Sequence, residues 1–196
     1  MADTIRDMVD DNSRINYRLL TNYIGHYAMP YFIEQIKHPL LVGKDLYDGE
    51  LMQNISTSQT MRFKLSQFQE GGDEAAPEVP QESKDPHESI TRAIYMLRKK
   101  PFSGGMPNVI SIGRSSENDV VIVDYSISKR HAQIILFHGL YFLMDIGSTN
   151  GTRVNGELVQ PNVKVKLEPA ANIAFGRIIF VFTLASELYQ GLRSAR

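Results

Sequence analysis

Four short motifs between residues 113 and 156 bring together polar side chains that suit the binding of an anion. They are Gly113-Arg114, Ser128-Lys129-Arg130-His131, Asp145-Ile146-Gly147-Ser148-Thr149-Asn150-Gly151-Thr152 and Val154-Asn155-Gly156. A guanidinium offers a planar fork of N–H donors that matches phosphate oxygens, and short hydroxyls add further donors. This set of groups is suited to holding a doubly charged oxyanion without reacting with it.

Short runs of β-type composition separate these motifs and would place them at turns. From residue 90 the runs are 93–97, 109–112, 120–123, 132–137, 140–144, 163–167 and 173–184. His138-Gly139 and Asn155-Gly156 each lie between two apolar stretches, and Asn-Gly is a strong signal for a two-residue hairpin turn. The last run is apolar on both faces and predicts one buried central strand. Strands this short and this regularly interrupted are typical of a β-sandwich.

Taken in order, the motifs resemble those of the forkhead-associated (FHA) domain, and the resemblance covers about residues 92–184. Each motif alone is a weak signal, whereas the ordered series at these separations is specific. The resemblance implies a fold class that is mainly β, an FHA-like β-sandwich of about eleven strands. A small helical or α+β N-terminal region would precede it. The resemblance also implies that loops at one end bind phosphothreonine peptides, with no cofactor.

The same resemblance assigns five residues to phosphopeptide binding: Arg114, Ser128, Lys129, Thr149 and Asn150. Arg114, Ser128 and Thr149 would contact the phosphate, and Asn150 would contact the peptide backbone. Lys129 stands where many relatives have Arg or Asn, so it would add charge with less geometric selectivity. The alternatives from the residues alone are an arginine that caps carbonyls at a strand end and hydroxyls that bond their own backbone in turns.

Five further residues are expected to shape the loops: Gly113, His131, Gly151, Asn155 and Gly156. By resemblance, His131 is an internal hydrogen-bond bridge that fixes a loop. A catalytic triad of Ser128, His131 and Asp145 would also need an oxyanion hole and a serine hydroxyl in contact with the imidazole. No nucleophile-elbow motif is present, so we expect a protein that is not an enzyme.

Composition divides the chain into four segments. Residues 70–89 contain seven acidic residues and three prolines but no aromatic residue, which predicts a flexible acidic linker. It separates a small N-terminal helical or mixed region of unknown role, residues 1–69, from the predicted sandwich at 90–185. Residues 186–196 form a tail with helical spacing. In the first region, apolar residues at every fourth position predict a helix over 13–37, with Ser13 as N-cap and a break at Pro30.

Charge and composition argue against several classes of protein. The chain has no cysteine, which excludes disulfides and cysteine-based zinc sites, and its five histidines show no metal-ligand spacing. No apolar run is long enough to span a membrane and the N-terminus lacks signal-peptide character, so we expect a cytoplasmic protein without a membrane partner. Residues 1–89 hold 15 acidic and 8 basic residues, whereas residues 90–196 hold 7 and 13. The basic half favours an anionic partner, but it lacks the basic helix or aromatic platform of nucleic-acid-binding proteins.

The leading hypothesis is an adaptor that binds phosphothreonine in a Ser/Thr kinase pathway. Its ligand is either a phosphorylated partner protein or peptide, or the chain's own N-terminal region. In that region Thr57 and Thr60 lie in a polar run, and the linker would raise their effective concentration at the basic half. The alternative hypothesis is a phosphate-independent scaffold or assembly protein whose N-terminal region docks to a larger complex.

Overall fold

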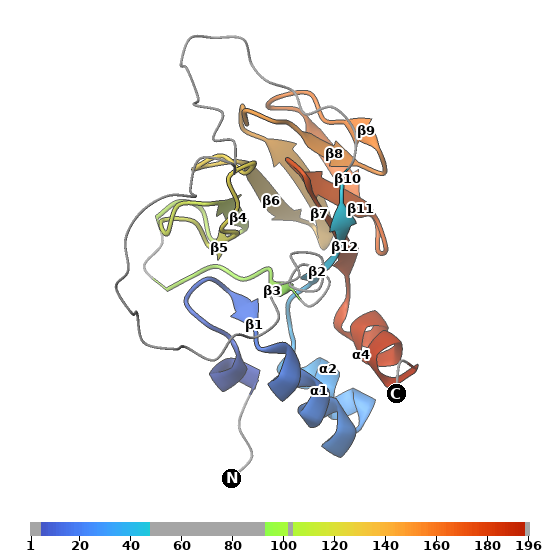
Figure 1. The fold of residues 1–196 in the computed structure, drawn as a ribbon. Helices are drawn as coiled ribbons and strands as arrows, with labels where there is room; N and C mark the ends of the chain where they lie inside the picture. Colours follow the sequence, from blue (N-terminus) through green and yellow to red (C-terminus); the bar gives the residue numbers. More distant parts are fainter. Residues whose placement is uncertain (1–4, 48–92, 102–103, 195–196) are drawn as a thin grey trace, which may run out of the picture.

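The computed structural model describes residues 5–47, 93–101 and 104–194, which form a β-sandwich with helices at one end (Figure 1). One sheet has seven strands in the order β1-β3-β2-β12-β11-β8-β9, and the other has five in the order β10-β7-β6-β4-β5. The described residues contain twelve strands, so the prediction of a mainly β sandwich is confirmed.

The strands are short and are joined mostly by turns. Their bounds are β1 Arg14–Ile15, β2 Leu40–Leu46, β3 Ile94–Met96, β4 Val109–Gly113, β5 Val120–Val121, β6 Ala132–Phe137, β7 Leu140–Asp145, β8 Thr152–Val154, β9 Glu157–Leu158, β10 Lys164–Leu167, β11 Asn172–Phe175 and β12 Ile178–Thr183. The helices are the 3-10 helix η1 Ile5–Met8 and the α-helices α1 Tyr17–His26, α2 Met29–Gln35 and α4 Ala185–Ser194.

Two hairpin turns fall where the sequence predicts them. His138 and Gly139 have φ angles of 48° and 76° and join β6 to β7, while Asn155 and Gly156 have φ angles of 52° and 88° and join β8 to β9. Positive φ at both central residues matches the right-handed twist of the flanking strands. Both turn predictions are confirmed.

The run 173–184 is a hairpin, so the prediction of one central strand is wrong. β11 ends at Phe175, which pairs with Ile178 at the start of β12. Gly176 makes the turn with a φ of +55°, and a Cβ on it would lie only 2.5 Å from the carbonyl oxygen of Ser126. The strands on both sides of the turn are buried and apolar, and Arg177 is the one charged residue between them. The sequence therefore reads as one continuous strand.

Strand β2 lies inside the seven-stranded sheet, although its residues precede the acidic segment in the sequence. It pairs antiparallel with β12 over Leu40–Leu46 and with β3 over residues 40–42. Leu41 faces the core between the sheets, and Leu40 faces the helices outside it. The assignment of these residues to a separate N-terminal region is therefore corrected. Burial on both faces of β2 accounts for its continuous apolar start.

The residues before α1 bridge the two sheets at one edge. β1 pairs with β3 of the seven-stranded sheet, whereas the carbonyl of Asn12 accepts a hydrogen bond from the N–H of Val121 in β5 at 3.1 Å. The hydroxyl of Ser13 donates to the carbonyl oxygen of Asp119 at 2.8 Å. The carboxylate of Asp119 is buried and forms an ion pair with Lys99 at 3.0 Å. The N-terminal residues therefore stabilise the open edge of the sandwich.

The helical stretch predicted over 13–37, with a break near Pro30, is confirmed as two short helices, although the first starts later than expected. Asn16 caps α1, because its side-chain oxygen accepts a hydrogen bond from the N–H of Leu19 at 3.1 Å. Ser13 was the expected cap, but it has a φ of 63° and precedes β1, so that prediction is wrong. Pro30 lies in the first turn of α2, where a missing N–H costs no helical hydrogen bond.

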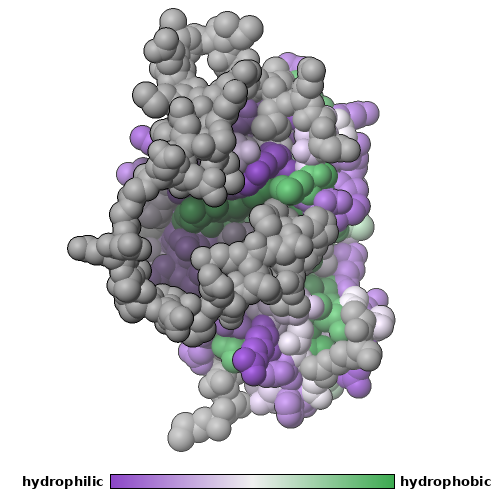
Figure 2. Space-filling view, viewed as in Figure 1, coloured by the Kyte–Doolittle hydropathy of each residue, from purple (hydrophilic) through white to green (hydrophobic). Residues whose placement is uncertain are grey.

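Two hydrophobic clusters stabilise the fold. One fills the space between the sheets and includes Ile112, Phe175 and Phe180. The other packs α1, α2 and α4 against the outer face of β2 and β3, and it includes Leu20, Phe32, Leu40, Ile94 and Leu188. Figure 2 shows that apolar side chains also gather in a band on the viewed face, at the height of β4 and β6 in Figure 1.

Some predictions fall on parts of the chain that the structure does not describe. The acidic linker at 70–89 and the candidate phosphorylation sites Thr57 and Thr60 lie outside the described residues. Within the described ranges, no helix is long and apolar enough to cross a membrane.

Deleting the N-terminal residues should unfold the sandwich. A fragment of residues 90–196 lacks β2, so β3 and β12 lose their shared neighbour and the burial of Leu40 and Leu41. Full burial of one leucine contributes about 1.5–3 kcal/mol, against a typical domain stability of about 5–15 kcal/mol. We expect no cooperative thermal transition for this fragment by circular dichroism.

Adding residues 1–69 as a separate chain should restore the transition, because β2 can then pair with both neighbours. A fragment that melts at the temperature of the full chain would show that β2 is dispensable.

Candidate functional site

The five candidate binding residues lie in loops at one edge of the five-stranded sheet. β4 pairs antiparallel with β6, and β6 pairs antiparallel with β7. The end of β4, the start of β6 and the end of β7 therefore meet at the same edge. Arg114 follows β4, Ser128 and Lys129 precede β6, and Thr149 and Asn150 lie between β7 and β8.

Ser128 and Thr149 are in direct contact across two loops. The backbone N–H of Thr149 donates to the hydroxyl oxygen of Ser128 at 2.9 Å, and the two hydroxyl oxygens are 3.2 Å apart. These residues are 21 positions apart in the sequence. The structure thus brings two hydroxyl donors to one point on the rim.

Arg114 is held beside Ser128 through its backbone. The N–H of Arg114 donates to the carbonyl oxygen of Ser128 at 3.0 Å, and the N–H of Ser115 donates to the carbonyl oxygen of Lys129 at 3.2 Å. The side chains of Arg114 and Lys129 are exposed. Both cationic side chains are therefore open to solvent, on the two loops that meet at Ser128.

Gly113 allows this close approach of β4 to the next loop. A Cβ on Gly113 would lie 2.3 Å from the carbonyl oxygen of Lys129, well inside van der Waals contact. Its backbone is otherwise ordinary strand, so the requirement is for space and not for an unusual φ angle.

Asn118 is a site residue that the motifs do not reveal. Its buried side-chain amide donates to the carbonyl oxygens of Ser115 and Lys129, at 2.8 and 2.7 Å. It therefore ties the loop of Arg114 to the loop of Ser128. In the sequence, Asn118 is only a polar residue between two strand-like runs. Ordinary turns have the same pattern, so the sequence does not reveal its role.

His131 is buried and connects three parts of the rim. Its Nδ1 accepts a hydrogen bond from the backbone N–H of Ser128 at 3.0 Å, so its Nε2, 3.3 Å from the carbonyl oxygen of Gly151, is the protonated nitrogen of a neutral ring. Burial lowers the pKa of His131 and favours this neutral form. The hydroxyl of Ser128 contacts Thr149 and not the imidazole, so the catalytic triad is not assembled.

Asp145 organises the loop that carries Thr149. Its carboxylate accepts hydrogen bonds from the hydroxyls of Ser148 and Thr152 at 2.6 and 2.5 Å, and from the N–H groups of Gly147 and Ser148 at 2.8 Å. Burial acts to raise the pKa of Asp145, but these hydrogen bonds outweigh it and lower the pKa. The loop is therefore built around a permanent negative charge.

Asn150 joins its loop to the loop that precedes Ser128. Its side-chain amide donates to the carbonyl oxygen of buried Ser126 at 2.8 Å. The hydroxyl of Ser126 donates to Asp124 at 2.6 Å and accepts a hydrogen bond from the N–H of Arg177 at 3.1 Å. Three loops therefore meet at Ser126, which lies outside the four motifs.

An ion pair fixes the outer side of this junction. The guanidinium of Arg177 donates to both oxygens of Asp124, at 2.7 Å in its closest contact, and it lies 4.3 Å from the ring centroid of Tyr125. Burial acts to raise the pKa of Asp124, but hydrogen bonds from Arg177 and Ser126 lower it. Arg177 is therefore engaged within the fold, unlike Arg114.

The remaining scaffold residues lie where the loops meet the seven-stranded sheet. The N–H of Asn155 donates to the carbonyl of Asn172 at 2.8 Å, and its side-chain oxygen accepts the N–H of Asn172 at 2.9 Å, so the β8–β9 hairpin is tied to β11. Gly156 completes the turn. Gly151 has a φ of 78°, and its carbonyl accepts a hydrogen bond from the N–H of Gly176 at 3.1 Å.

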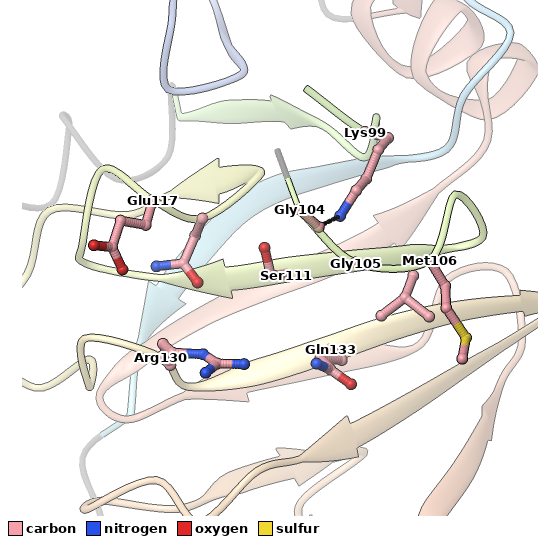
Figure 3. Close-up of a pocket in the computed structure, with 10 residues that line it drawn as sticks. Lys99, Gly104, Gly105, Met106, Ser111, Glu117, Arg130 and Gln133 are labelled. Atoms are coloured by element: carbon pink, nitrogen blue, oxygen red, sulfur yellow. Dashed lines mark hydrogen bonds between the residues drawn. The ribbon is translucent and has the colours of Figure 1, made fainter. Parts of the chain in front are cut away.

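A cleft of about 450 Å³ lies next to this rim on the outer face of the five-stranded sheet (Figure 3). Arg130 and Asn118 line its end nearest the rim, and Met106 and Val109 line another part. None of the five candidate binding residues lines it. In the described part of the chain, no group of acidic and histidine side chains is arranged to hold a metal ion.

Sequence comparison identifies a known domain in this part of the chain. Residues 110–176 match the family model of the FHA domain. The oxoglutarate dehydrogenase inhibitor of Corynebacterium efficiens is 36% identical over 94 residues, which cover 46% of this chain and 64% of that protein. The glycogen accumulation regulator GarA of Mycolicibacterium smegmatis is 36% identical over 94 residues, which cover 46% and 58%. The chain thus spans less than two thirds of the length of these relatives.

Solved FHA domains are also similar. The N-terminal FHA domain of Rad53p from S. cerevisiae, in complex with a phosphothreonine peptide, is 27% identical with a TM-score of 0.37, over 47% of this chain and 78% of that one. The FHA domain of the CT664 protein from Chlamydia trachomatis is 26% identical with a TM-score of 0.38, over 46% and 84%. The resemblance to FHA domains predicted from the motifs is confirmed by the family match.

A Gly113→Ala substitution should disturb the rim. The added methyl would meet the carbonyl oxygen of Lys129, so β4 and the loop of Ser128 must separate, at a cost of about 1–3 kcal/mol. We expect a lower midpoint of urea unfolding. Gly104→Ala is the matched control, because a Cβ on Gly104 meets nothing within 4 Å. Equal midpoints for the two variants would contradict the close approach.

Acidification should destabilise the protein through His131. Burial holds its pKa below the usual 6.5, so at lower pH the unfolded chain binds a proton that the folded protein does not. The free energy of unfolding is therefore largest above pH 6.5 and falls as the pH decreases toward the folded pKa. Urea unfolding at about pH 7.5 and about pH 5 should show a greater loss for the wild type than for His131→Gln.

His38, whose pKa burial also lowers, is present in both proteins and cancels in this comparison. The pKa values of Asp124 and Asp145 lie below 3.8, outside this pH range. An equal loss of stability in the two proteins would mean that His131 is protonated in the folded state.

Proposed function

We propose that this chain, which contains an FHA domain, is a phosphothreonine-dependent protein-interaction module in a Ser/Thr kinase pathway. The observation that carries the proposal is the contact between Ser128 and Thr149, with the backbone of Arg114 bonded to Ser128. The two hydroxyls meet at one point at the edge of the sandwich, and the guanidinium of Arg114 would turn toward the same point. This is the donor set that a phosphate ester requires.

Each candidate residue has a role that its position supports. The exposed guanidinium of Arg114 would form a paired contact with two phosphate oxygens, and the hydroxyls of Ser128 and Thr149 would turn to donate to the others. Lys129 would add attraction as a point charge. The side-chain amide of Asn150 donates to Ser126, which orients its oxygen to accept an N–H of the peptide backbone.

The hydrogen bonds beneath the rim would increase affinity without touching the ligand. Asn118, His131 and Asp145 hold the three loops in place before a ligand arrives. Ordering an immobilised side chain on binding costs about 0.5–1.5 kcal/mol. Loops that are already ordered avoid much of this cost.

The expected affinity is moderate. Hydrogen bonds to charged groups contribute about 1.5–3 kcal/mol each, so three or four of them would give about 5–8 kcal/mol after desolvation, close to the roughly 8 kcal/mol of micromolar binding. A small pocket for the threonine methyl would favour threonine over serine by about 1 kcal/mol. Because the second pKa of a phosphate ester is about 6, binding should weaken below that pH.

The proposal includes a regulatory and not a catalytic role. The similar proteins are by name a regulator and an inhibitor, and the serine–histidine geometry needed for hydrolysis is not assembled. The module would act in the cytoplasm, where kinases and ATP are available. Its ligand is a phosphorylated partner or, as a second option, a phosphorylated Thr57 or Thr60 of its own chain.

Arg114→Ala should strongly weaken binding of a phosphothreonine peptide. Loss of a paired contact to phosphate should weaken binding by at least about 2 kcal/mol, which is roughly 30-fold. Calorimetric titration of an oriented phosphothreonine peptide library would measure the change. Ser128→Ala and Thr149→Ala should each weaken binding less, because each removes one neutral donor.

Arg18→Ala is the matched control, since Arg18 is exposed on α1 away from the rim. Phosphoserine and unmodified peptides complete the comparison. Partner binding that survives Arg114→Ala would instead favour the phosphate-independent scaffold.

A further inference from the structure

The outer face of the five-stranded sheet carries a set of apolar residues beside its polar outward residues Ser111, Gln133, Lys164 and Lys166. Strand register places Ile135 of β6 opposite Phe142 of β7 and opposite Val109 of β4, and it pairs Phe137 with Leu140. Successive residues of a strand alternate between faces, and the neighbours of this set, Ile110, Ile134 and Leu143, belong to the core between the sheets. The outward positions Val109, Ile135, Phe137, Leu140, Phe142 and Met144 therefore form one surface, here called the outer strip.

Ile135 marks the outer strip as a surface distinct from the core. Only 8% of it is exposed, yet it belongs to neither of the two hydrophobic clusters. Phe137 and Leu140, at the far end of the strip, are 58% and 45% exposed. An antiparallel sheet with one solvated face normally carries polar residues at such positions. The exposed apolar residues of the strip therefore indicate a binding surface.

The other sheet shows what such a pattern looks like when it is covered. There the outward residues Leu40, Ile94 and Met96 pack against α1, α2 and α4. No described helix covers the outer strip (Figure 1). The strip is therefore the unpartnered counterpart of a covered face.

Two cations flank the strip at the end nearest the phosphate site. Arg130 lines the cleft on the β4 side (Figure 3), and Lys164 of β10 lies opposite Met144 on the other side. Neither forms an ion pair with a described residue, whereas Lys166 pairs with Glu168 at 2.6 Å. Glu117 is the one acidic residue that lines the cleft. Along β6, the end of the strip near the candidate phosphate site is therefore positively charged, and the far end is apolar.

The strip begins at the same edge as the candidate phosphate site. β6 starts at Ala132, directly after the loop of Ser128, and Phe137 lies at its other end. Five residues of strand span roughly 17 Å. A ligand held at Ser128 reaches Arg130 and Lys164 within about two to four extended residues, and Phe137 within about six to eight.

We propose that the outer strip binds a second segment of the same phosphorylated partner. This segment is rich in acidic residues within about four positions of the phosphothreonine. It carries apolar residues at alternate positions about six to ten residues from the phosphothreonine. This rests on the proposed phosphothreonine binding and extends it to the flanking sequence. The segment lies along β6, with its acids against Arg130 and Lys164 and its apolar side chains over Phe137 and Leu140. Such a contact would use the proposed anion site, the two cations that have no ion pair with a described residue, and the exposed apolar surface together.

A second copy of this chain fits the surface poorly. In a two-fold symmetric contact the same patch lies on both subunits. When the two-fold axis runs parallel to β6, such a contact over the strip brings Arg130 and Lys164 close to the same residues of its mate. Like charges opposed at an interface disfavour that partner, whereas an acidic flank meets them with opposite charge.

The test compares three synthetic peptides that share one phosphothreonine core. One is the core alone, one adds a ten-residue flank of acidic residues followed by alternating Leu and Phe, and one adds a Gly-Ser flank of equal length. Each flank is tried on either side of the core. Calorimetry against the wild type should show the acidic–apolar peptide binding about tenfold tighter than the Gly-Ser peptide, a difference of about 1.4 kcal/mol.

The double variant Phe137→Ser/Leu140→Ser should lose this gain while it binds the core peptide as the wild type does. Both residues are exposed, so the fold should tolerate the change. Arg130→Glu should remove the preference for the acidic flank. Ile33→Ser, an exposed apolar residue on α2, is the matched control and should keep the full gain. Equal affinity for the two flanked peptides, or a gain that persists in the double variant, would overturn the proposal.

Failure of the proposed function gives a different result. If the core peptide does not bind the wild type, phosphothreonine recognition is refuted. The unphosphorylated acidic–apolar peptide then tests the outer strip alone. Binding of this peptide to the wild type but not to the double variant would support the strip as a docking surface. Sedimentation velocity tests self-association. A wild-type dimer that the double variant abolishes would assign the strip to a second copy and overturn the proposal.

Discussion

The rim of this sandwich depends on one buried, neutral imidazole. His131 accepts the N–H of Ser128 on one nitrogen and bonds the carbonyl of Gly151 on the other, so it holds the loop before β6 and the loop after β7 at a fixed separation. A charged ring has two donors and no acceptor, and it would lose the bond to Ser128. Burial keeps the ring neutral and therefore keeps the two hydroxyls of Ser128 and Thr149 together. The chemistry at the surface is thus set by a group that the ligand never meets.

In the rim, the groups proposed to contact the ligand are exposed, and the groups that hold the loops in place are buried. The exposed groups Arg114 and Lys129 supply charge, while buried groups beneath them supply shape. Asn118 and Ser126 each bond to groups from different loops. Asp145 bonds to several groups within the loop that carries Thr149. Buried polar groups are costly when unpaired, so a fully bonded network tolerates few alternative loop positions. This is the physical basis for treating the rim as formed before the ligand binds.

The N-terminal residues are part of the same folded unit. β2 supplies a strand between β3 and β12, and Asn12 and Ser13 reach the edge of the other sheet. Helices α1, α2 and α4 then cover the outer face of the seven-stranded sheet. The two outer faces of the sandwich are therefore unequal. One is covered by the chain's own helices, and the other presents the outer strip beside the proposed phosphate site.

The sandwich and its two hairpin turns with positive φ could be predicted from the sequence, because they follow from alternation over a few residues and from short-range turn chemistry. Other features depend on the folded chain. The place of β2, the hairpin hidden in 173–184 and the roles of Asn118, Ser126 and Arg177 depend on contacts between residues far apart in the chain. A buried asparagine that bridges two loops and a turn asparagine have the same local sequence signal. Only the folded chain distinguishes them, because only there does the partner carbonyl lie within hydrogen-bonding distance.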